Sequence, residues 1–287
     1  MQPNTSYCGG VDHSQIVLAD NDTWTSGEVS GASSGAQSGA VVCGTACVLN
    51  NMNIHDNPNA FAGIYVRTGS ETAVSMTIRG GRVTRSGSLG IGGGGVPHLT
   101  ISGVEIDHNG ASANCGDEGG GFKGVNSGAR ITNNYVHDNN CMGIWFDINA
   151  SNNEIDHNRV ANNADGGIFY EISQNATIHD NTVTGNGAGA CGWLWGAGIG
   201  VASSFNVQVY SNTLSGNCNG IDGTQQNRTD SAPPAHLLMN LSIHNNSIAG
   251  SGQTGVVADT GADLTTRNIV FASNSFSGGS SLCGFSC

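Results

Sequence analysis

A short phrase of apolar residues around a polar turn recurs along most of the chain. It reads TISGVEI at 100–106, EIDHNRV at 154–160 and TIHDNTV at 177–183, and nine such phrases follow one another at intervals of 23 to 34 residues. Each unit holds short β-branched segments between Gly and Asn turns and is too small to bury an apolar face by itself. Stacking is the way such units bury a core. The repeat therefore predicts an all-β solenoid, a parallel β-helix of about nine coils.

A second phrase, Gly followed by an aliphatic residue, falls once in nearly every interval. It opens GIWFDI at 143–148 and GIFYEI at 167–172, and Gly119-Gly120 fills the corresponding place one interval earlier. We interpret these segments as the same strand on consecutive coils. The turn of the first phrase carries an Asn at 134, 158, 181, 212, 246 and 274. Asn tolerates left-handed turns and stacked amides can bond from coil to coil, so we interpret this column as scaffold.

With these repeats, residues 40–280 resemble the right-handed parallel β-helix proteins of the pectate-lyase-like class. The resemblance implies the fold. It does not select an activity, because the class includes polysaccharide lyases, glycoside hydrolases, epimerases, phage tailspikes and non-enzymatic surface proteins. We expect one domain over residues 1–287, with 1–40 as an N-terminal cap or first coil and 277–287 as a C-terminal end segment.

Charge and cysteine content limit the kinds of molecule that the protein is expected to bind and the compartment in which it is expected to work. Nine Lys and Arg against 21 Asp and Glu give a net charge of −12, which argues against nucleic acid or an anionic membrane as the main partner. No apolar run approaches the length of a membrane span, and the first 30 residues lack the order of a signal peptide, so an export signal was removed or never present. Nine Cys without a CxxC pair indicate a secreted, disulfide-bonded protein.

Two connections, 111–118 and 188–197, are longer than the others and each carries a Cys. The next coil carries another Cys two residues before its Gly, which predicts the bridges Cys115–Cys141 and Cys191–Cys218. These bridges would pin the two loops as walls of a groove. Two further bridges, Cys43–Cys47 and Cys283–Cys287, are expected to close local loops. Cys8 is then the cysteine to which no partner is assigned.

The outward positions of the Gly-aliphatic strand carry the candidate catalytic residues. Lys123, Asp147 and Glu171 are spaced 24 residues apart, and Lys123 is the only lysine in the chain. Because neighbouring coils lie about 4.8 Å apart, we expect the three side chains to stack within mutual reach. One carboxyl group would then have a raised pKa while the lysine keeps the other charged, as an acid/base pair requires.

Further residues are expected to bind substrate. Trp145 and Phe169 would offer a flat apolar surface for sugar rings beside the acids. The other candidates are Trp193 and Trp195 on the second loop, Asp222 in the Trp145 column, and His108 and His137 as auxiliary acids. Asp117 and Glu118 offer a calcium site as an alternative to a solvated loop tip; no other cofactor or metal is expected.

We therefore predict a secreted polysaccharide-cleaving enzyme, a glycoside hydrolase whose carboxylate pair lies in a groove on the outside of the β-helix. One alternative is a polysaccharide lyase in which Lys123 is the base that removes the proton beside a uronate. Another is a non-catalytic surface or adhesive β-helix, in which Lys123 and Asp147 form an ordinary ion pair and Glu171 solvates a surface.

Overall fold

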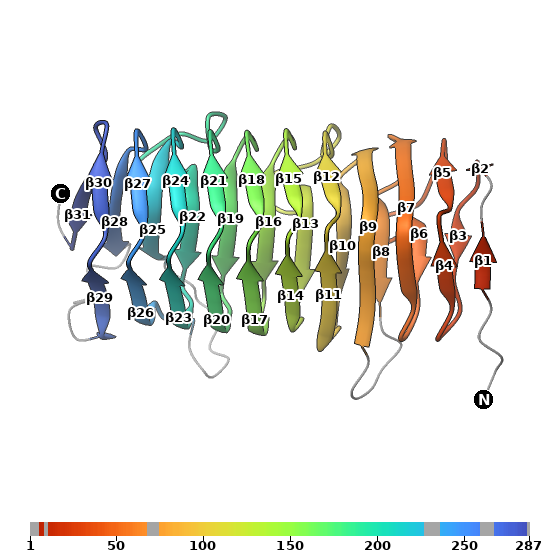
Figure 1. The fold of residues 1–287 in the computed structure, drawn as a ribbon, viewed down its shortest axis with the longest axis horizontal. Coiled ribbons are helices and arrows are strands. Elements are labelled where there is room, and N and C mark those ends of the chain that lie inside the picture. The colour runs from red at the N-terminus through yellow and green to blue at the C-terminus, as the bar shows by residue number, and fades with distance from the viewer. Residues whose placement is uncertain (1–5, 9–10, 68–74, 227–235, 259–266, 286–287) are drawn as a thin grey trace.

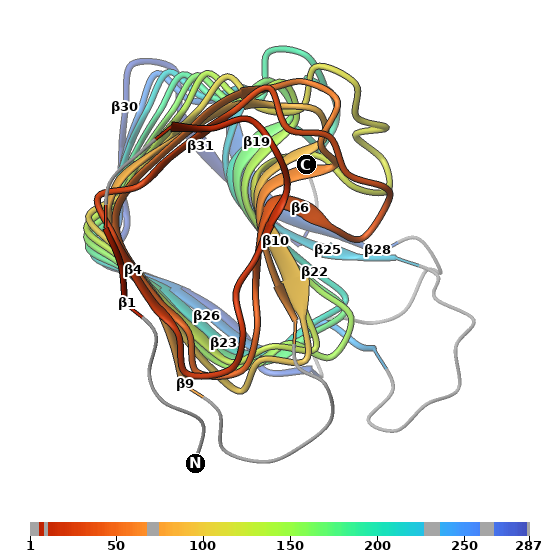
Figure 2. The same cartoon turned by 90° about the vertical axis from the view of Figure 1, so that its right-hand side faces the viewer.

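The computed structural model describes residues 6–8, 11–67, 75–226, 236–258 and 267–285. All its elements are β-strands, and they pair in parallel into a 20-stranded sheet A and an 11-stranded sheet B. The strands stack along one long axis into a parallel β-helix, and the coils superpose in the view at 90° (Figures 1 and 2). The predicted solenoid is confirmed. No helix long and apolar enough for a membrane span occurs in the described ranges.

Each coil contributes one strand to sheet B. These strands are β3 (Ile16–Val17), β6 (Gly39–Cys43), β8 (Ala62–Arg67), β10 (Leu89–Gly94), β13 (Gly120–Val125), β16 (Met142–Asp147), β19 (Gly166–Glu171), β22 (Ala197–Ala202), β25 (Asn219–Gln225), β28 (Gln253–Ala258) and β31 (Ser281–Gly284). Sheet B has 11 strands rather than about nine because β3 and β6 extend it into the first 43 residues.

Sheet A holds two series of strands that correspond to the two halves of the apolar phrase. The first series is β1 (Ser6–Cys8), β4 (Thr23–Thr25), β7 (Val48–Asn57), β9 (Ser75–Ser86), β11 (His98–Ser102), β14 (Ala129–Thr132), β17 (Ser151–Asp156), β20 (Gln174–His179), β23 (Phe205–Tyr210), β26 (Met239–His244) and β29 (Ile269–Ala272). The second is β2 (Val11–Asp12), β5 (Glu28–Ser30), β12 (Glu105–Asp107), β15 (Tyr135–His137), β18 (Arg159–Ala161), β21 (Thr182–Thr184), β24 (Thr213–Ser215), β27 (Ser247–Ala249) and β30 (Ser275–Ser277). Strands β7 and β9 are long enough to pair in both series.

The core is a continuous apolar column enclosed by the coils. Ile144 and Ile168 are buried in register on neighbouring strands, and the rings of Phe146 and Tyr170 lie 5.9 Å apart between centroids. Burial at about 25 cal/mol per Å² of apolar surface makes this column the main source of stability. A single coil would expose both its apolar edges, so the coils are stable only as a stack.

The predicted Asn column is scaffold. Asn134 Nδ2 donates to Asn158 Oδ1 at 3.0 Å, and the same bond continues coil by coil to Asn274. The left-handed conformation belongs to the preceding residue, such as Asn133 with φ 56°, so the ladder Asn is free to turn its amide inward. A second ladder, which we did not predict, joins Asn109, Asn139, Asn163, Asn186 and Asn217.

Candidate active site

Two rows of side chains point outward from sheet B. The first row runs Gly92, Lys123, Trp145, Phe169, Gly200 and Asp222, each paired in register with the next strand. The second row runs Gly94, Val125, Asp147, Glu171, Ala202 and Thr224, since Asp147 and Glu171 each follow the paired Phe146 and Tyr170. Side chains two residues apart on a strand share a face, so both rows line the same outer surface.

The predicted single column of Lys123, Asp147 and Glu171 is wrong for the lysine. Lys123 is in register with Trp145, whereas Asp147 is in register with Val125. The counterpart of Gly143-Ile144 is Gly121-Phe122, not Gly119-Gly120, which displaces Lys123 by two residues. The lysine therefore approaches Asp147 diagonally, from one row to the other.

Lys123 is held by three contacts and is 5% exposed. Its Nζ lies 3.0 Å from Oδ2 of Asp147 and 3.6 Å from the centroid of the Trp145 ring, and it donates to the backbone carbonyl of Asp117. Asp147 is 7% exposed, and its Oδ1 also accepts from the backbone N–H of Ile148 at 2.8 Å. A buried pair with these additional hydrogen bonds fixes the lysine between the 111–118 loop and the sheet.

Trp145 and Phe169 do not form the exposed platform that we predicted. They are 4% and 8% exposed and pack with Ala202 and Met142 into a cluster on the outside of sheet B. Strand alternation correctly placed them outside the helix, but neighbouring side chains cover them. The exposed aromatic side chain that contacts this cluster is Trp195, which is 41% exposed and whose ring centroid lies 6.1 Å from that of Phe169. Trp193 is 51% exposed and lies on the same loop.

Glu171 ends β19 in the second row, on the strand next to that of Asp147, and is 6% exposed. Parallel strands lie about 4.8 Å apart, so the two carboxylate-bearing residues sit on adjacent rungs of the sheet. On its other side Glu171 is in register with Ala202, the smallest side chain of the second row after Gly94.

Asp222 is in the Trp145 row, as predicted, and is 1% exposed. Neither carboxyl oxygen has a hydrogen-bond partner. Burial raises the pKa of Asp222 well above its usual range. Burial therefore disfavours the charged form of the Asp222 carboxyl group.

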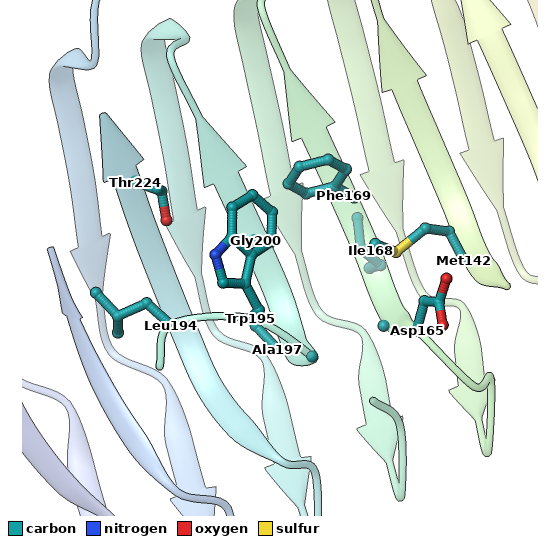
Figure 3. Close-up of a pocket in the computed structure, with 11 residues that line it drawn as sticks. Met142, Asp165, Ile168, Phe169, Leu194, Trp195, Ala197, Gly200 and Thr224 are labelled. Atoms are coloured by element: carbon teal, nitrogen blue, oxygen red, sulfur yellow. The ribbon is translucent and has the colours of Figure 1, made fainter. Parts of the chain in front are cut away.

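Two hollows open on this face, on either side of the Trp145 and Phe169 cluster. One, of about 230 Å³, lies over β10 and is lined by Tyr65, Gly94, Glu118 and Lys123, among others. The other, about 10 Å³, lies over β22; Met142, Asp165 and Phe169 line one side, and Trp195 and Thr224 lie across Gly200 (Figure 3).

Both long connections are pinned as predicted. Cys115 is bonded to Cys141 and Cys191 to Cys218, and the local bridge Cys43–Cys47 is present as well. Cys283 is also disulfide-bonded, whereas its expected partner Cys287 lies outside the described residues. In the second loop, Asn219 Nδ2 donates to the carbonyls of Gly192 and Trp195 at 2.8 and 3.0 Å, which holds Trp195 at the edge of the hollow.

The acidic pair Asp117 and Glu118 is engaged in contacts within the protein. Asp117 Oδ2 accepts from Asn114 at 2.5 Å, and Glu118 Oε1 accepts from Gln37 Nε2 at 2.6 Å. Two groups of potential metal ligands lie elsewhere: Cys115, Cys141 and Asp165, and Glu105, Asp107 and His137. The cysteines of the first group form a disulfide, so they are not available as thiolate ligands.

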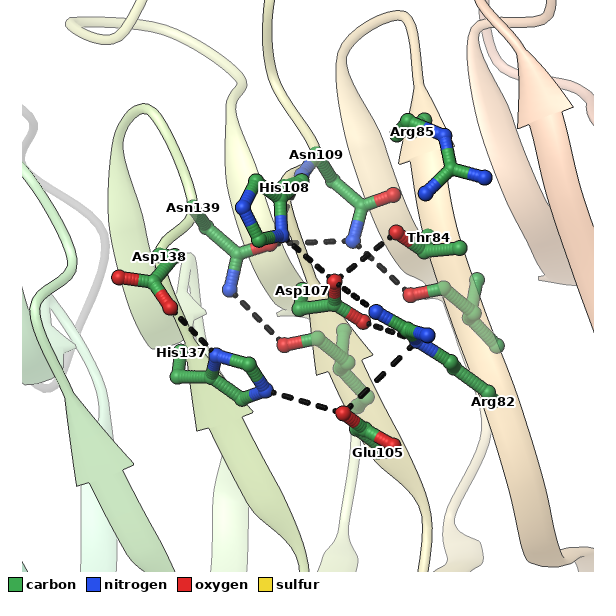
Figure 4. A network of polar contacts seen from close by, with 12 residues as sticks. Arg82, Thr84, Arg85, Glu105, Asp107, His108, Asn109, His137, Asp138 and Asn139 are labelled. Carbon is green, nitrogen blue, oxygen red and sulfur yellow. Dashed lines mark hydrogen bonds and ion pairs between the residues drawn. The ribbon is translucent and has the colours of Figure 1, made fainter.

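His108 and His137 are not part of this face. They follow and end strands of sheet A, where His108 Nδ1 lies 2.6 Å from Asp107 and His137 bridges Asp138 and Glu105 at 2.6 and 3.2 Å (Figure 4). Burial raises the pKa of Asp107, but hydrogen bonds from Arg82, His108 and Thr84 outweigh it and lower the pKa to about 2. The prediction of auxiliary acids at the groove is therefore wrong, because these histidines belong to an ion-pair network on another sheet.

Comparison with known proteins agrees with this architecture. The family described as right handed beta helix region matches residues 111–231. The protein is a right-handed parallel β-helix repeat protein. No curated protein matches its sequence.

Among solved structures, the A-module of the mannuronan C-5 epimerase AlgE6 of Azotobacter vinelandii is similar with a TM-score of 0.50 and 14% identity, over 99% of this chain and 90% of that one. The full-length tailspike protein 2 of an Escherichia coli O157:H7 bacteriophage is similar with a TM-score of 0.50 and 16% identity, over 97% of this chain and 38% of that one. At these identities the likeness concerns the fold.

Proposed function

We propose that the protein is a secreted glycoside hydrolase that cleaves a polysaccharide lying on the outer face of sheet B. The observation that carries the proposal is the placement of Asp147 and Glu171, two carboxylate residues that point outward from adjacent strands yet are only 7% and 6% exposed. Burying a charged residue on the outside of a solenoid costs desolvation free energy, and residues buried in this way often belong to functional sites.

The chemistry needs two carboxyl groups in different protonation states. We assign Asp147, whose Oδ2 lies 3.0 Å from the Lys123 ammonium, as the base or nucleophile and Glu171, on the next strand, as the proton donor. Glu171 gives its proton to the glycosidic oxygen as the bond from that oxygen to the anomeric carbon breaks. Water adds to the anomeric carbon and loses a proton to a carboxylate, so that one water molecule is consumed for each bond that is cut.

Lyase chemistry with Lys123 as the base is less well supported. The Nζ atom is engaged by Asp147, the Trp145 ring and the Asp117 carbonyl, and an amine must be free and unprotonated to remove a proton. A uronate substrate would also have to approach a chain of net charge −12. Secretion is supported by the disulfides, which persist in oxidising compartments.

A digest of a panel of neutral and uronate polysaccharides tests the proposal. We expect new reducing ends from at least one glycan, without ultraviolet absorbance from an unsaturated ring. Products that carry the unsaturated ring would make the enzyme a lyase. Absence of cleavage across the panel would favour the non-catalytic alternative.

A further inference from the structure

Both hollows on the outer face of sheet B lie over strands whose outward residues are the smallest available. Gly92 and Gly94 occupy the two rows on β10, and Gly200 and Ala202 occupy them on β22. A Cβ atom added at Gly200 would lie 3.0 Å from the Phe169 ring, inside the space that forms the hollow. Gly94 and Gly200 line the two hollows, so the side chains missing at these positions leave two depressions at a fixed distance along the β-helix axis.

The spacing of the two depressions suits an extended chain. Strand β22 is the fourth strand of sheet B after β10, which places the hollows roughly 19 Å apart at about 4.8 Å per strand. Sugar units of an extended β-linked glycan advance by a length close to one strand spacing. A chain of about five units therefore reaches from one hollow to the other across Asp147 and Glu171.

The charge of the lining residues excludes an anionic chain. Lys123 is the one cation among the described residues that line either hollow, and Asp147 neutralises it at 3.0 Å while Glu118 adds a negative charge to the same hollow. The hollow over β22 is lined by one ionisable residue, Asp165. A uronate or sulfated sugar at either end would meet a carboxyl group without a free cation to balance it.

From these observations we infer that the outer face of sheet B binds an uncharged glycan about five sugar units long, with the hollows over β10 and β22 as its end subsites. The inference rests on the proposed function, since it names the substrate class of the same groove. The hollow over β22 is too small to enclose a sugar ring. The terminal ring would instead lie across its mouth, against the exposed indole of Trp195.

One half-buried carboxyl group and one buried carboxyl group lie at the hollow over β22. Burial raises the pKa of Asp165, which lines the hollow over β22, and that of Asp222, whose neighbours Gly200 and Thr224 line it. The raised pKa of Asp165 favours its neutral form, which gives no charge attraction to an anion and can donate a hydrogen bond to a sugar hydroxyl. Both groups are on the side where Trp195 offers its stacking surface.

The test is calorimetric binding to the full chain with Glu171→Gln, or with Asp147→Asn if the first variant unfolds at a lower temperature than the wild type. The probes are the pentasaccharides of xylan, cellulose, mannan and laminarin, and penta-galacturonate and penta-mannuronate at the same ionic strength. We expect at least one neutral pentasaccharide to bind ten-fold or more tightly than either uronate, and its trisaccharide to bind more weakly. Equal or tighter binding of a uronate, or no binding of any neutral probe, overturns the inference.

Variants that fill the hollows locate the subsites. Gly94→Val and Gly200→Val place a branched side chain at positions that line the hollows and have no positive φ, and each should weaken pentasaccharide binding at least five-fold. Trp195→Ala should weaken it more than Trp193→Ala, because Trp193 does not line the hollow. Unchanged binding in both glycine variants overturns the assignment of end subsites. Neutral glycan binding without cleavage by the wild type would contradict the hydrolase proposal and leave this inference intact.

Discussion

The Lys123 ammonium lies 3.0 Å from the Asp147 carboxylate although the two residues belong to different rows of sheet B. The contact is diagonal, from β13 to β16, and it is covered on the outside by the 111–118 loop, whose Asp117 carbonyl accepts from the same ammonium. The only lysine of the chain therefore joins a loop, an aromatic ring and a carboxylate at one point.

Lys123→Met should destabilise the protein by about 3–5 kcal/mol, because it leaves the buried Asp147 carboxylate without its counterion. Chemical unfolding at pH 7 measures the change. The double variant Lys123→Met with Asp147→Leu removes both charges and should recover most of the loss. If the single variant is as stable as the wild type, the pair is not held as described. If the enzyme is a hydrolase, Lys123→Met should lower its activity moderately and shift its pH profile. If Lys123 is the base of a lyase, the same substitution should abolish activity.

Glu171→Gln should lower turnover of a cleavable glycan by about 100-fold or more, the usual contribution of a general acid. Its side chain points away from the core, so thermal unfolding should change little. The control is Glu154→Gln, which alters a half-exposed carboxylate on sheet A beside Arg130 and leaves the groove unchanged. Near-normal turnover of the Glu171 variant would remove this residue from the mechanism.

Asp222→Asn should stabilise the protein at neutral pH and have little effect in acid. The folded-state pKa of Asp222 is raised above the model-compound value of 3.8, so its contribution to stability is fully present below about pH 3.8 and is lost as pH rises through the folded-state pKa. Thermal unfolding of both proteins across a pH series is the measurement. We expect the two proteins to unfold at similar temperatures at low pH, and the variant to become the more stable one as pH rises. A difference that does not change with pH would show that Asp222 titrates normally.

Asp107→Asn should cost about 2 kcal/mol of stability at pH 7, since its pKa is held at about 2 against 3.8 in the unfolded chain. A depressed pKa means that this stability is present above about pH 4 and is lost as pH falls towards 2. The variant should therefore lose less stability than the wild type between these values. Urea unfolding at several pH values measures the difference, and an equal acid sensitivity would contradict the assigned network.

Replacing Cys191 and Cys218 together by Ser should lower stability by about 2–4 kcal/mol. It should also weaken glycan binding, because the bridge and Asn219 hold the loop that presents Trp195. The matched control is the bridge Cys43–Cys47, whose residues line neither hollow. A non-reducing peptide map should recover Cys115–Cys141 and Cys191–Cys218, and a free thiol at any of these four positions would contradict the pinned loops.

Much of the scaffold could be predicted from the repeat because its chemistry is local to each coil. The phrase around Asn158 places one apolar residue, Ile155 or Val160, on each side of a polar turn, and this pattern corresponds to β17 and β18. The bridges Cys115–Cys141 and Cys191–Cys218 could be predicted as well, since stacked coils bring residues at equivalent places of the repeat together.

The site was harder to predict because it depends on register and on what covers the sheet. Three consecutive glycines at 119–121 allow more than one alignment of β13, and each alignment puts Lys123 in a different place. Alternation showed that Trp145 points outward, but it did not show that Lys123, from the neighbouring strand β13, covers its ring. His108 lies close to the 111–118 loop in sequence, yet it directly follows strand β12 of sheet A.

Each Asn of the ladder at Asn134 bonds to the equivalent residue of the following coil, always from Nδ2 to Oδ1. A coil inserted into or deleted from the stack would keep every such bond in kind, because both of its ends present the same donor and acceptor. The ladder thus makes the protein extensible in units of one coil. Duplication or loss of a coil between β10 and β22 would lengthen or shorten the groove by about 4.8 Å, close to one sugar unit, so glycan length is a property that evolution can adjust without redesigning the core.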